Sequence, residues 1–367
     1  MKSTRKTGIG DLLIIGFDGA EMSARLSSLL RRMQPAGVVL FGRNIESAEQ
    51  TWRLLADCQK CVEAPLLTCV DLEGGRVDRF RQAIGPAPSA ADVFSTGDRA
   101  LFRKHGFLIG SNCRALGFNV DFAPALDLAF EASRSVMSSR AVSANPKEVV
   151  KYAREFLHGL EDAGVIGCGK HFPGLGEGNL DSHADLPIIK KPYRRMWQED
   201  IVPYRTLRRE LPMVMSSHGA FPALTTKPVP ASLSKRWITD VLRKAIGYRG
   251  LIASDDLEMG GVLKAAPLGQ AAVEFIRSGG DLALVCHLEE YVVEAYEALS
   301  RECAADPKFR RRVEESAARV SKFKKNWSRH LRPVKVPTEK QVTQLTTSLW
   351  EFSEQVRLSQ INREESA

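Results

Sequence analysis

Eight short apolar runs, spaced along most of the chain, constrain its fold more than any other feature of the sequence. Each has the length of a buried β-strand, and most are separated by enough residues for a helix. Helical patterns lie between them, for example at 148–163, 235–245 and 268–278. Apolar strands that alternate with helices predict an α/β fold with a parallel sheet, here a single closed (β/α)8 TIM-like barrel. The runs cover residues 12–17, 37–41, 65–70, 118–122, 165–169, 213–216, 251–254 and 282–286.

An open, doubly wound dinucleotide-binding sheet is the competing α/β architecture. It requires a G-x-G-x-x-G turn after the first strand, and residues 16–20 read G-F-D-G-A, which does not match. A phosphate-binding G-x-x-x-x-G-K-[ST] sequence is also absent. The sequence therefore favours the closed barrel.

Polar residues stand directly after the apolar runs. In a parallel barrel the carboxyl ends of all strands face one mouth, where the loops carry the chemistry. Residues that are far apart in the sequence are therefore predicted to share one cleft. They are Asp18, Arg43, Asp71, Asp121, Asp127, Lys170, His171, His218, Asp255, Asp256 and His287.

The end of the chain differs from the rest in charge. The formal net charge is +8, and the basic excess lies entirely within residues 301–340, so the remainder is neutral. Helical patterns at 289–304 and 309–325, a Pro-rich break at 332–337 and a last helix at 343–363 follow the barrel. We predict a catalytic barrel over 1–300 and a basic helical C-terminal extension over 301–367. A solvated helix face is the favoured interpretation of its charge, so we expect no nucleic-acid partner.

Several features indicate where the protein resides. No apolar run approaches the roughly 20 residues that span a bilayer, so we expect no membrane insertion. The N-terminus lacks the small-residue cleavage site of a secretory signal. The seven cysteines are scattered and odd in number, which favours reduced thiols. We expect a cytoplasmic protein.

The segment 169–187 contains the densest set of chemical groups. It leaves the fifth strand with Lys170 and His171, continues through three alternating glycines and reaches Asp181 and His183. Alternating glycines permit unusual backbone angles and a loop that changes conformation. A carboxylate two residues from an imidazole can hold one tautomer and raise its basicity, as a general acid/base requires. A surface loop with a turn-forming Asp is the plainer interpretation.

Two further strand ends carry carboxylates. Asp255 and Asp256 follow the seventh run, where a carboxylate can act as a nucleophile or a metal ligand. Because side chains alternate along a strand, one of the two should face the cleft while the other caps a helix or accepts a hydrogen bond. Within V-D-L-E-G-G-R-V-D-R-F, hydrogen-bonding groups suited to sugar hydroxyls or a carboxylate are offered by Asp71, Arg76 and Arg79.

With these segments in place, the sequence resembles the β-N-acetylglucosaminidases of glycoside hydrolase family 3. The resemblance is collinear over roughly residues 10–290, and its most specific part is K-H-F-P-G-x-G with D-S-H-x-x-L-P followed by S-D-D-L-x-M. It rests on the strings GVVLFGRNI, VDLEGGRVDRF, NVDFAPALD, GKHFPGLGEGNLDSHADLP, MSSHGAFPA and LIASDDLEMGG.

The resemblance implies a retaining mechanism on a (β/α)8 barrel without a metal or other cofactor. By that pattern Asp255 is the nucleophile, His183 is the general acid/base and Asp181 is its partner. A loop-borne histidine then replaces the second carboxylate of other retaining glycosidases. The positions matching those that bind the N-acetylglucosamine unit are Asp71, Arg79, Arg140, Lys170 and His171.

This chain departs from the family pattern at two places. Residues 174–176 read G-L-G where the family has G-H-G, so Leu175 stands in place of a polar group. The surroundings of Arg140 read S-S-R-A-V-S rather than D-R-S-F-G. Both positions that match catalytic residues are intact, so we expect an active enzyme.

The implied substrate is a peptidoglycan fragment, N-acetylglucosamine β-1,4-linked to anhydro-N-acetylmuramic acid with or without peptide, released during cell-wall recycling. Water is the expected acceptor and phosphate is the alternative. We expect a monomer that binds only this small carbohydrate. Two other functions stay open: a metal-dependent barrel hydrolase using His171, His183, His218 and Asp255, and a non-catalytic muropeptide-binding homologue.

Overall fold

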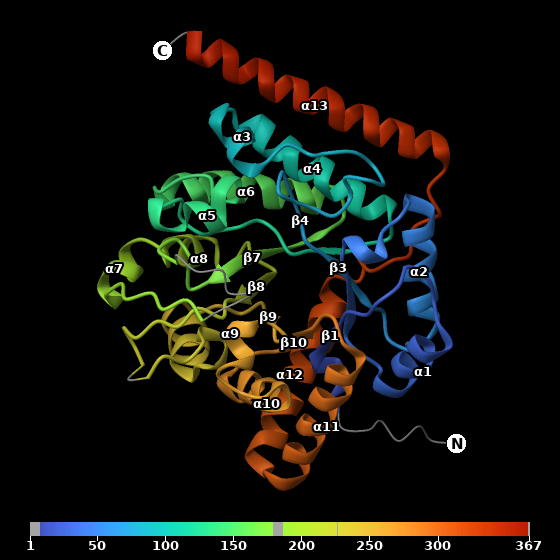
Figure 1. Cartoon of the computed structure of the whole chain (residues 1–367), viewed down its shortest axis with the longest axis vertical. Coiled ribbons are helices and arrows are strands. Elements are labelled where there is room, and N and C mark those ends of the chain that lie inside the picture. The colour runs from blue at the N-terminus through green and yellow to red at the C-terminus, as the bar shows by residue number, and fades with distance from the viewer. Residues whose placement is uncertain (1–7, 179–185, 226, 366–367) are drawn as a thin grey trace.

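A computed structural model describes residues 8–178, 186–225 and 227–365, and it contains a closed barrel of eight parallel strands (Figure 1). Neighbouring strands around the barrel are β1, β10, β9, β8, β7, β6, β3 and β2. The predicted (β/α)8 barrel is therefore confirmed, and every apolar run overlaps one of its strands, although β7 and β9 extend beyond their runs into polar residues. The strands are β1 (Leu13–Ile15), β2 (Gly37–Leu40), β3 (Leu67–Val70), β6 (Val120–Asp121), β7 (Ile166–Phe172), β8 (Met213–Ser216), β9 (Leu251–Asp256) and β10 (Leu282–Val285).

The strands are mostly apolar before their carboxyl ends because both of their faces are buried. Along β1, Ile14 packs inside the barrel whereas Leu13 and Ile15 pack outward beneath the helices. Along β2, Val39 points inward between two outward-facing residues. Alternating side chains thus fill an inner core and an outer core, as expected for a parallel strand covered on both sides.

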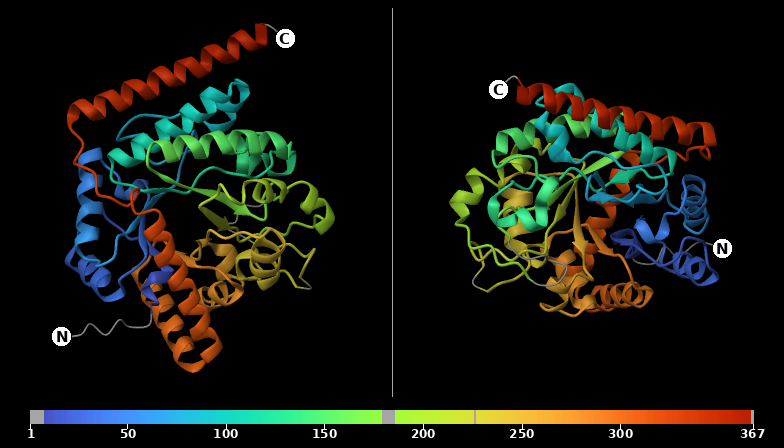
Figure 2. Two further views of the ribbon diagram at one scale, coloured as in Figure 1. Left: turned by 180° about the vertical axis from the view of Figure 1, so that it is seen from behind. Right: turned by 45° about the horizontal axis from the view of Figure 1, so that its top comes forward.

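Helices surround the barrel and connect its strands (Figure 2). The predicted helix at 268–278 has those bounds in the structure, and the one at 148–163 begins two residues earlier and ends one residue earlier. The helix predicted at 235–245 is present as a π-helix, Arg236–Ala245. The helices up to the eighth strand are α1 (Ala24–Met33), α2 (Ala48–Lys60), α3 (Ala90–Ser95), α4 (Arg99–Ala115), α5 (Arg134–Met137), α6 (Pro146–Asp162), α7 (Tyr193–Gln198), α8 (Val202–Leu207), α9 (Gly260–Leu263) and α10 (Leu268–Ser278).

A short hairpin follows β3 at the mouth of the barrel. Its strands are β4 (Leu72–Gly74) and β5 (Val77–Asp78), and its turn uses positive φ angles of 80° at Gly74 and 56° at Gly75. Glycine is the residue that adopts such angles without steric cost, so the glycine pair fixes the turn. The hairpin positions the residues between Asp71 and Arg79.

Three helices follow β10, namely α11 (Glu289–Ala305), α12 (Pro307–Asn326) and α13 (Glu339–Glu365). Helix α12 closes the end of the barrel opposite the mouth, which we call the floor, because Val320 and Phe323 pack into the inner core. Helix α13 lies outside the barrel and runs across α3 and α4 (Figures 1 and 2).

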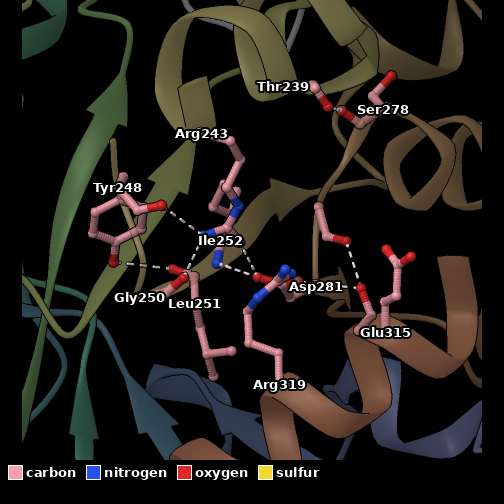
Figure 3. A network of polar contacts seen from close by, with 12 residues as sticks. Thr239, Arg243, Tyr248, Gly250, Leu251, Ile252, Ser278, Asp281, Glu315 and Arg319 are labelled. Atoms are coloured by element: carbon pink, nitrogen blue, oxygen red, sulfur yellow. Dashed lines mark hydrogen bonds and ion pairs between the residues drawn. The ribbon is translucent and has the colours of Figure 1, made fainter. Parts of the chain in front are cut away.

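Charged residues bind α12 to the floor through Asp281, a buried residue just before β10 (Figure 3). Its carboxylate accepts hydrogen bonds from the guanidinium groups of Arg243, Arg312 and Arg319. The hydroxyl of Ser316 donates to the same carboxylate at 3.1 Å. The basic segment predicted to be solvated is thus only partly so, because two of its arginines face the barrel.

Two further predicted properties can be compared with the structure. All seven cysteines are buried and free of disulfide bonds, in agreement with the predicted reduced thiols. Within the described ranges, no helix is both long and apolar enough to cross a membrane.

Candidate active site

Lys170 is the centre of a buried ion-pair network at the carboxyl ends of β3 and β7. Its Nζ lies 2.6 Å from Oδ1 of Asp71 and 2.5 Å from Oε1 of Glu73. Asp71 directly follows β3, and Glu73 lies in the hairpin that comes next. The structure therefore brings together two of the predicted sugar-binding residues, and it adds Glu73, which the sequence analysis did not select.

Arg140 joins this network from the segment between β6 and β7. Its guanidinium donates to both oxygens of Glu73, at 2.8 Å from Nε and 2.7 Å from Nη2. Such two-pronged Arg–carboxylate pairs fix orientation as well as charge. Nη2 also lies 3.3 Å from Nε2 of His171. Although the residues around Arg140 depart from the family pattern, its side chain reaches the same cluster as Lys170.

The contacts of His171 define which of its ring nitrogens carries the proton. Arg140 can only donate, so Nε2 of His171 must accept, and the proton belongs on Nδ1. Nδ1 then donates to Oδ2 of Asp127 at 2.7 Å. Asp127 is itself held by the backbone N–H groups of His171 and Leu175, at 3.1 Å and 2.6 Å. Asp127 therefore orients the imidazole toward the network.

The charges in this network stabilise one another. Burial alone would raise the pKa of Glu73, but Arg140 and Lys170 outweigh it and hold the pKa well below its ordinary value. Burial would likewise lower the pKa of Lys170, yet Asp71 and Glu73 raise it. Glu73 and Lys170 are consequently charged at neutral pH. The site offers fixed cationic donors and anionic acceptors, an arrangement suited to hydroxyl groups of a ligand.

A buried carboxylic acid supports the hairpin from below. Asp121 ends β6, is fully buried and accepts a hydrogen bond from the backbone N–H of Leu72 at 3.0 Å. Burial raises the pKa of Asp121 well above its ordinary value. This strand-end residue, which the sequence placed at the mouth, thus fixes the hairpin that presents Glu73.

Asp255 stands at the end of β9 with its carboxylate largely uncommitted. Its Oδ1 accepts a hydrogen bond from the backbone N–H of Asp256 at 2.9 Å. Burial alone would raise the pKa of this carboxyl, but the imidazoles of His218 and His171 and the neighbouring backbone N–H outweigh it and hold the pKa below the ordinary value of 3.8. An ionised, partly buried carboxylate at this place has the properties of a nucleophile.

The neighbouring Asp256 has a different role, as the alternation along the strand predicted. Its Oδ2 lies 3.1 Å from Nε2 of His287, and its Oδ1 accepts the backbone N–H of Glu258 at 3.1 Å. His287 in turn stacks on Phe41, with 5.3 Å between ring centroids. Asp256 is therefore engaged in structural contacts, whereas Asp255 is free to act.

His218 is buried below this strand end, and both of its ring nitrogens have hydrogen-bond partners. Its Nε2 lies 2.9 Å from the backbone oxygen of Asp256, which can only accept, so Nε2 donates. Its Nδ1 lies 2.8 Å from the hydroxyl oxygen of Ser232, and burial lowers the pKa of the imidazole. The geometry makes His218 a support for the Asp255–Asp256 backbone.

Arg79 lies apart from the Lys170 network. Its guanidinium carbon is 5.8 Å from the centre of the Phe41 ring, on the side of the mouth formed by β2. Its Nε is buried and has no hydrogen-bond partner among the residues that the structure describes. Of the five predicted sugar-binding residues, it is the one that the cluster does not include.

The predicted acid/base His183 and its partner Asp181 lie outside the described residues. The segment leading to them is described as far as Gly178. Within it, Leu175 is buried in the outer core, and Gly219 approaches it so closely that an added Cβ would lie 3.1 Å from Cδ2 of Leu175. The leucine that replaces the family histidine therefore has an apolar environment.

The sequence analysis did not assign Asp127 or Glu73 to the sugar-binding set, for different reasons. Asp127 belongs to the predicted strand-end residues, but nothing in the sequence assigns it to His171. Glu73 lies within a quoted motif, yet its importance depends on the approach of Arg140 from a distant loop. Among the described residues no three His, Cys, Asp or Glu side chains converge as a metal-binding group.

Comparisons with known proteins agree with this geometry. The model of the glycosyl hydrolase family 3 N-terminal domain matches residues 4–323. A β-hexosaminidase of Alkalilimnicola ehrlichii is 38% identical over 287 residues, which are 76% of this chain and 82% of that protein. A glycoside hydrolase family 3 β-N-acetylglucosaminidase from a Paenibacillus species superposes with a TM-score of 0.87 at 31% identity, over 95% of this chain and 69% of that one. A family 3 glycosyl hydrolase from Mycobacterium smegmatis has a TM-score of 0.77 at 30% identity, over 86% and 96% of the two chains.

Proposed function

Because this chain belongs to glycosyl hydrolase family 3 and is a glycoside hydrolase of the β-hexosaminidase class, we propose that it removes terminal β-linked N-acetylglucosamine with retention of configuration. The observation that carries this proposal is Asp255, an ionised carboxylate at the mouth with one backbone donor. A fixed polar cluster at the carboxyl ends of β3 and β7 consists of Lys170, Asp71, Glu73, Arg140 and His171.

The proposed reaction has two steps. In the first, the Asp255 carboxylate attacks the anomeric carbon, the glycosidic C–O bond breaks, and the leaving oxygen takes a proton from His183. In the second, His183 takes a proton from water, the water oxygen attacks the anomeric carbon, and Asp255 departs as a carboxylate. Asp181 holds the imidazole in the required tautomer. Two inversions give net retention.

The polar cluster is proposed to bind the terminal sugar. The ammonium of Lys170 and the guanidinium of Arg140 donate to its hydroxyl groups, while the free lone pairs of Asp71 accept from them. His171, oriented by Asp127, supplies a further contact. The guanidinium of Arg79, whose Nε has no described partner, is proposed to donate from the side of the mouth next to β2.

The physiological assignment follows from the family resemblance. We propose that the substrate is N-acetylglucosamine joined to anhydro-N-acetylmuramic acid, with or without peptide, and that the enzyme works as a cytoplasmic monomer in peptidoglycan recycling. Residues 1–300 carry the catalytic barrel in this proposal. Residues 301–367 are the helical extension, whose α12 supports the floor of the barrel.

The test is hydrolysis of the synthetic disaccharide and of an aryl N-acetyl-β-glucosaminide, each with and without a chelator and with and without phosphate. Product anomers are followed by NMR immediately after mixing. We expect the β-anomer of N-acetylglucosamine to form first and chelation to leave the rate unchanged. An initial α-anomer would contradict the two-step mechanism, whereas activity restored only by zinc or manganese would support a metal-dependent hydrolase. A glycosyl phosphate product would change the acceptor but retain the catalytic residues.

A further inference from the structure

A group of cations surrounds one aromatic ring at the side of the mouth formed by β2. The guanidinium carbons of Arg43 and Arg79 lie 4.8 Å and 5.8 Å from the centre of the Phe41 ring. The imidazole of His287 stacks on the same ring, with 5.3 Å between the centroids. Guanidinium groups pack favourably against aromatic rings, so the ring holds both arginines in place. We call these four residues the Phe41 rim.

The Phe41 rim lies where the leaving part of a substrate would pass. Phe41 and Arg43 follow β2, His287 follows β10, and β1 lies between these two strands in the barrel. The proposed sugar-binding cluster around Lys170 lies at the ends of β3 and β7, and Asp255 lies in β9. A terminal sugar held by that cluster, with its anomeric carbon at Asp255, therefore directs its leaving group toward the remaining side, β10, β1 and β2. The rim is placed to contact the unit to which the terminal sugar is joined, the aglycone.

Protein contacts fix the guanidinium of Arg43 but do not use all of its donors. Its Nε lies 2.9 Å from Oδ1 of Asp18, and its Nη2 donates to the backbone oxygen of Cys286 at 2.7 Å. Its Nη1 has no hydrogen-bond partner among the residues that the structure describes. The side chain is 30% exposed. The two N–H groups of Nη1, on a cation that is already oriented, are consequently available to a ligand.

The carboxylates next to the Phe41 rim do not balance its cations. Asp18 pairs with Arg43, but its side chain is 76% exposed, so water screens this ion pair. Asp256 pairs with His287. Arg79 forms no ion pair or hydrogen bond within the described part of the chain, and its Nε is buried. Because like charges repel one another, a cluster with this excess of cations favours a bound anion.

We propose that Arg43 is a specificity-determining residue that binds a carboxylate on the aglycone. The N–H groups of its Nη1 donate to the carboxylate, and Arg79 beside it adds positive charge. Charge-assisted hydrogen bonds from a guanidinium suit a carboxylate ligand. The inference rests on the proposed hydrolysis of N-acetylglucosaminides and adds the chemical class of the leaving unit, an acidic sugar. Anhydro-N-acetylmuramic acid is such a sugar through the carboxylate of its lactyl ether.

The test compares two substrates that differ in charge, N-acetylglucosaminyl-anhydro-N-acetylmuramic acid and its methyl ester. Both have the same glycosidic bond and the same leaving oxygen. We expect the wild-type kcat/KM for the acid to exceed that for the ester about threefold to tenfold, mainly through a lower KM. The difference should shrink as salt is raised to about 1 M, where exposed charges are screened. Equal values of kcat/KM for the acid and the ester overturn the proposal.

Two variants of Arg43 assign the preference to this residue. Arg43→Gln removes the charge and should lower kcat/KM for the acid about threefold to tenfold, with a loss of less than about twofold for the ester. Arg43→Lys keeps the charge and should recover part of the preference for the acid. Circular dichroism with thermal melting verifies that each variant is folded. Equal losses on both substrates in Arg43→Gln would be a merely structural effect and overturn the proposal.

Asp18 offers the matched control because it is the other half of the same ion pair. Asp18→Asn removes a carboxylate that competes with the ligand for Arg43, so kcat/KM for the acid should stay the same or rise by up to about threefold. If Arg43 serves only to pair with Asp18, then Asp18→Asn and Arg43→Gln lower kcat/KM for the acid alike. That outcome overturns the proposal.

An aryl N-acetyl-β-glucosaminide, whose aglycone has no carboxylate, separates this inference from the proposed function. Hydrolysis of the aryl glycoside and of both disaccharides by the wild type, without a preference for the acid, overturns the role of Arg43 and leaves the proposed function intact. Failure of the folded wild type to hydrolyse any of the three substrates overturns both. Hydrolysis of all three, with a preference for the acid that Arg43→Gln loses, supports the inference.

Discussion

The two ends of the barrel both contain buried charge, but they use it differently. At the floor, Asp281 is fully buried and both of its oxygens accept hydrogen bonds: Oδ1 from Ser316 and two arginines, Oδ2 from Arg243 and the backbone N–H of Ile252 (Figure 3). At the mouth, Asp255 accepts a single described hydrogen bond, from the backbone. A carboxylate with every lone pair engaged stabilises the fold, whereas one with free lone pairs can react.

The comparison also separates the mouth into supporting and reacting groups. Asp127 accepts three hydrogen bonds and Glu73 is held by Arg140 and Lys170, so these carboxylates resemble Asp281 in their saturation. Asp255 accepts one described hydrogen bond, from the backbone, and Asp71 accepts one, from Lys170, so these two carboxylates keep free lone pairs. Burial and charge therefore do not by themselves identify the reactive carboxylate. The number of hydrogen bonds that a carboxylate already accepts from the protein is the better guide.

The largest expected effect is on catalysis at the mouth. Asp255→Asn should lower kcat about 10⁴-fold, or about 5 kcal/mol in the barrier, because the amide cannot form the glycosyl-enzyme. The free energy of unfolding, measured in urea, should change by less than about 1 kcal/mol because few contacts are lost. Asp256→Asn is the matched control and should retain at least about a tenth of the activity. If Asp256→Asn were inactive and Asp255→Asn active, the nucleophile would be Asp256 and the assignment to Asp255 would be wrong.

The floor should show the opposite pattern. Asp281→Asn leaves three guanidinium groups without their common counter-charge, so we expect the free energy of unfolding to fall by about 3–5 kcal/mol. The kcat of the folded fraction should be unchanged. Asp240→Asn removes a partly exposed carboxylate that pairs with Arg236 and Lys244, and it should cost less than about 1 kcal/mol. If Asp281→Asn lowered kcat without lowering stability, charge at the floor would serve catalysis as charge at the mouth does, and the proposed difference between the two ends would be wrong.

A third group of charges, around the buried ammonium of Lys191, can be compared with the floor and the mouth. Its carboxylates, on Glu177, Glu199 and Asp200, outnumber its cations, on Lys191 and Arg195. Burial raises the pKa of Asp200 to about 6, above its ordinary 3.8, so the folded protein holds this proton more tightly than the unfolded chain does. The stability contributed by this group is therefore full below about pH 4 and falls by up to about 3 kcal/mol as the pH rises through about 6. Asp200→Asn should raise the free energy of unfolding by about 1–3 kcal/mol at pH 8, with the gain shrinking toward pH 5. A gain that is constant with pH would show that Asp200 does not titrate in this range.

The smallest expected effect concerns the contribution to stability of the pair formed by His287, which is half-exposed, and Asp256. The hydrogen bond from His287 to Asp256 raises the pKa of His287 above its ordinary value of 6.5. The stabilisation is therefore full below pH 6.5 and disappears as the pH rises through the raised value. His287→Gln should cost about 0.2–1 kcal/mol at pH 6 and nothing measurable at pH 9, as urea titrations at the two pH values would show. An equal cost at both pH values would assign the contribution to stacking on Phe41 instead.

The sequence was sufficient to predict the barrel and the set of residues at its mouth, because eight buried strands carry their chemistry at one end. It could not pair those residues. Lys170 and Asp71 are 99 positions apart, and their contact depends on the register of β3, β6 and β7. Glu73 was missed because its partner, Arg140, arrives from an irregular segment whose path no periodic pattern describes.

The basic C-terminal segment shows the same limit. A charged helix looks solvated when only its composition is known, and Arg310, Arg311, Lys322 and Lys325 are indeed exposed. Arg312 and Arg319 instead bind Asp281, and Lys324 is buried with its pKa lowered to about 8 by the loss of solvent. Which face of α12 turns inward depends on the floor it covers, and that surface exists only after the strands have closed.

The position of α12 has a consequence for how the protein is made. Synthesis proceeds from the N-terminus, so β10 and Asp281 leave the ribosome before Arg312 and Arg319 do. Until then, the nascent chain holds all eight strands but lacks two of the three cations that neutralise Asp281, together with the apolar side chains that cover the floor. A ribosome that stalls after β10 would therefore release a chain that has every catalytic residue and no completed barrel. We therefore expect translation of α12 to be the step that completes the floor of the barrel.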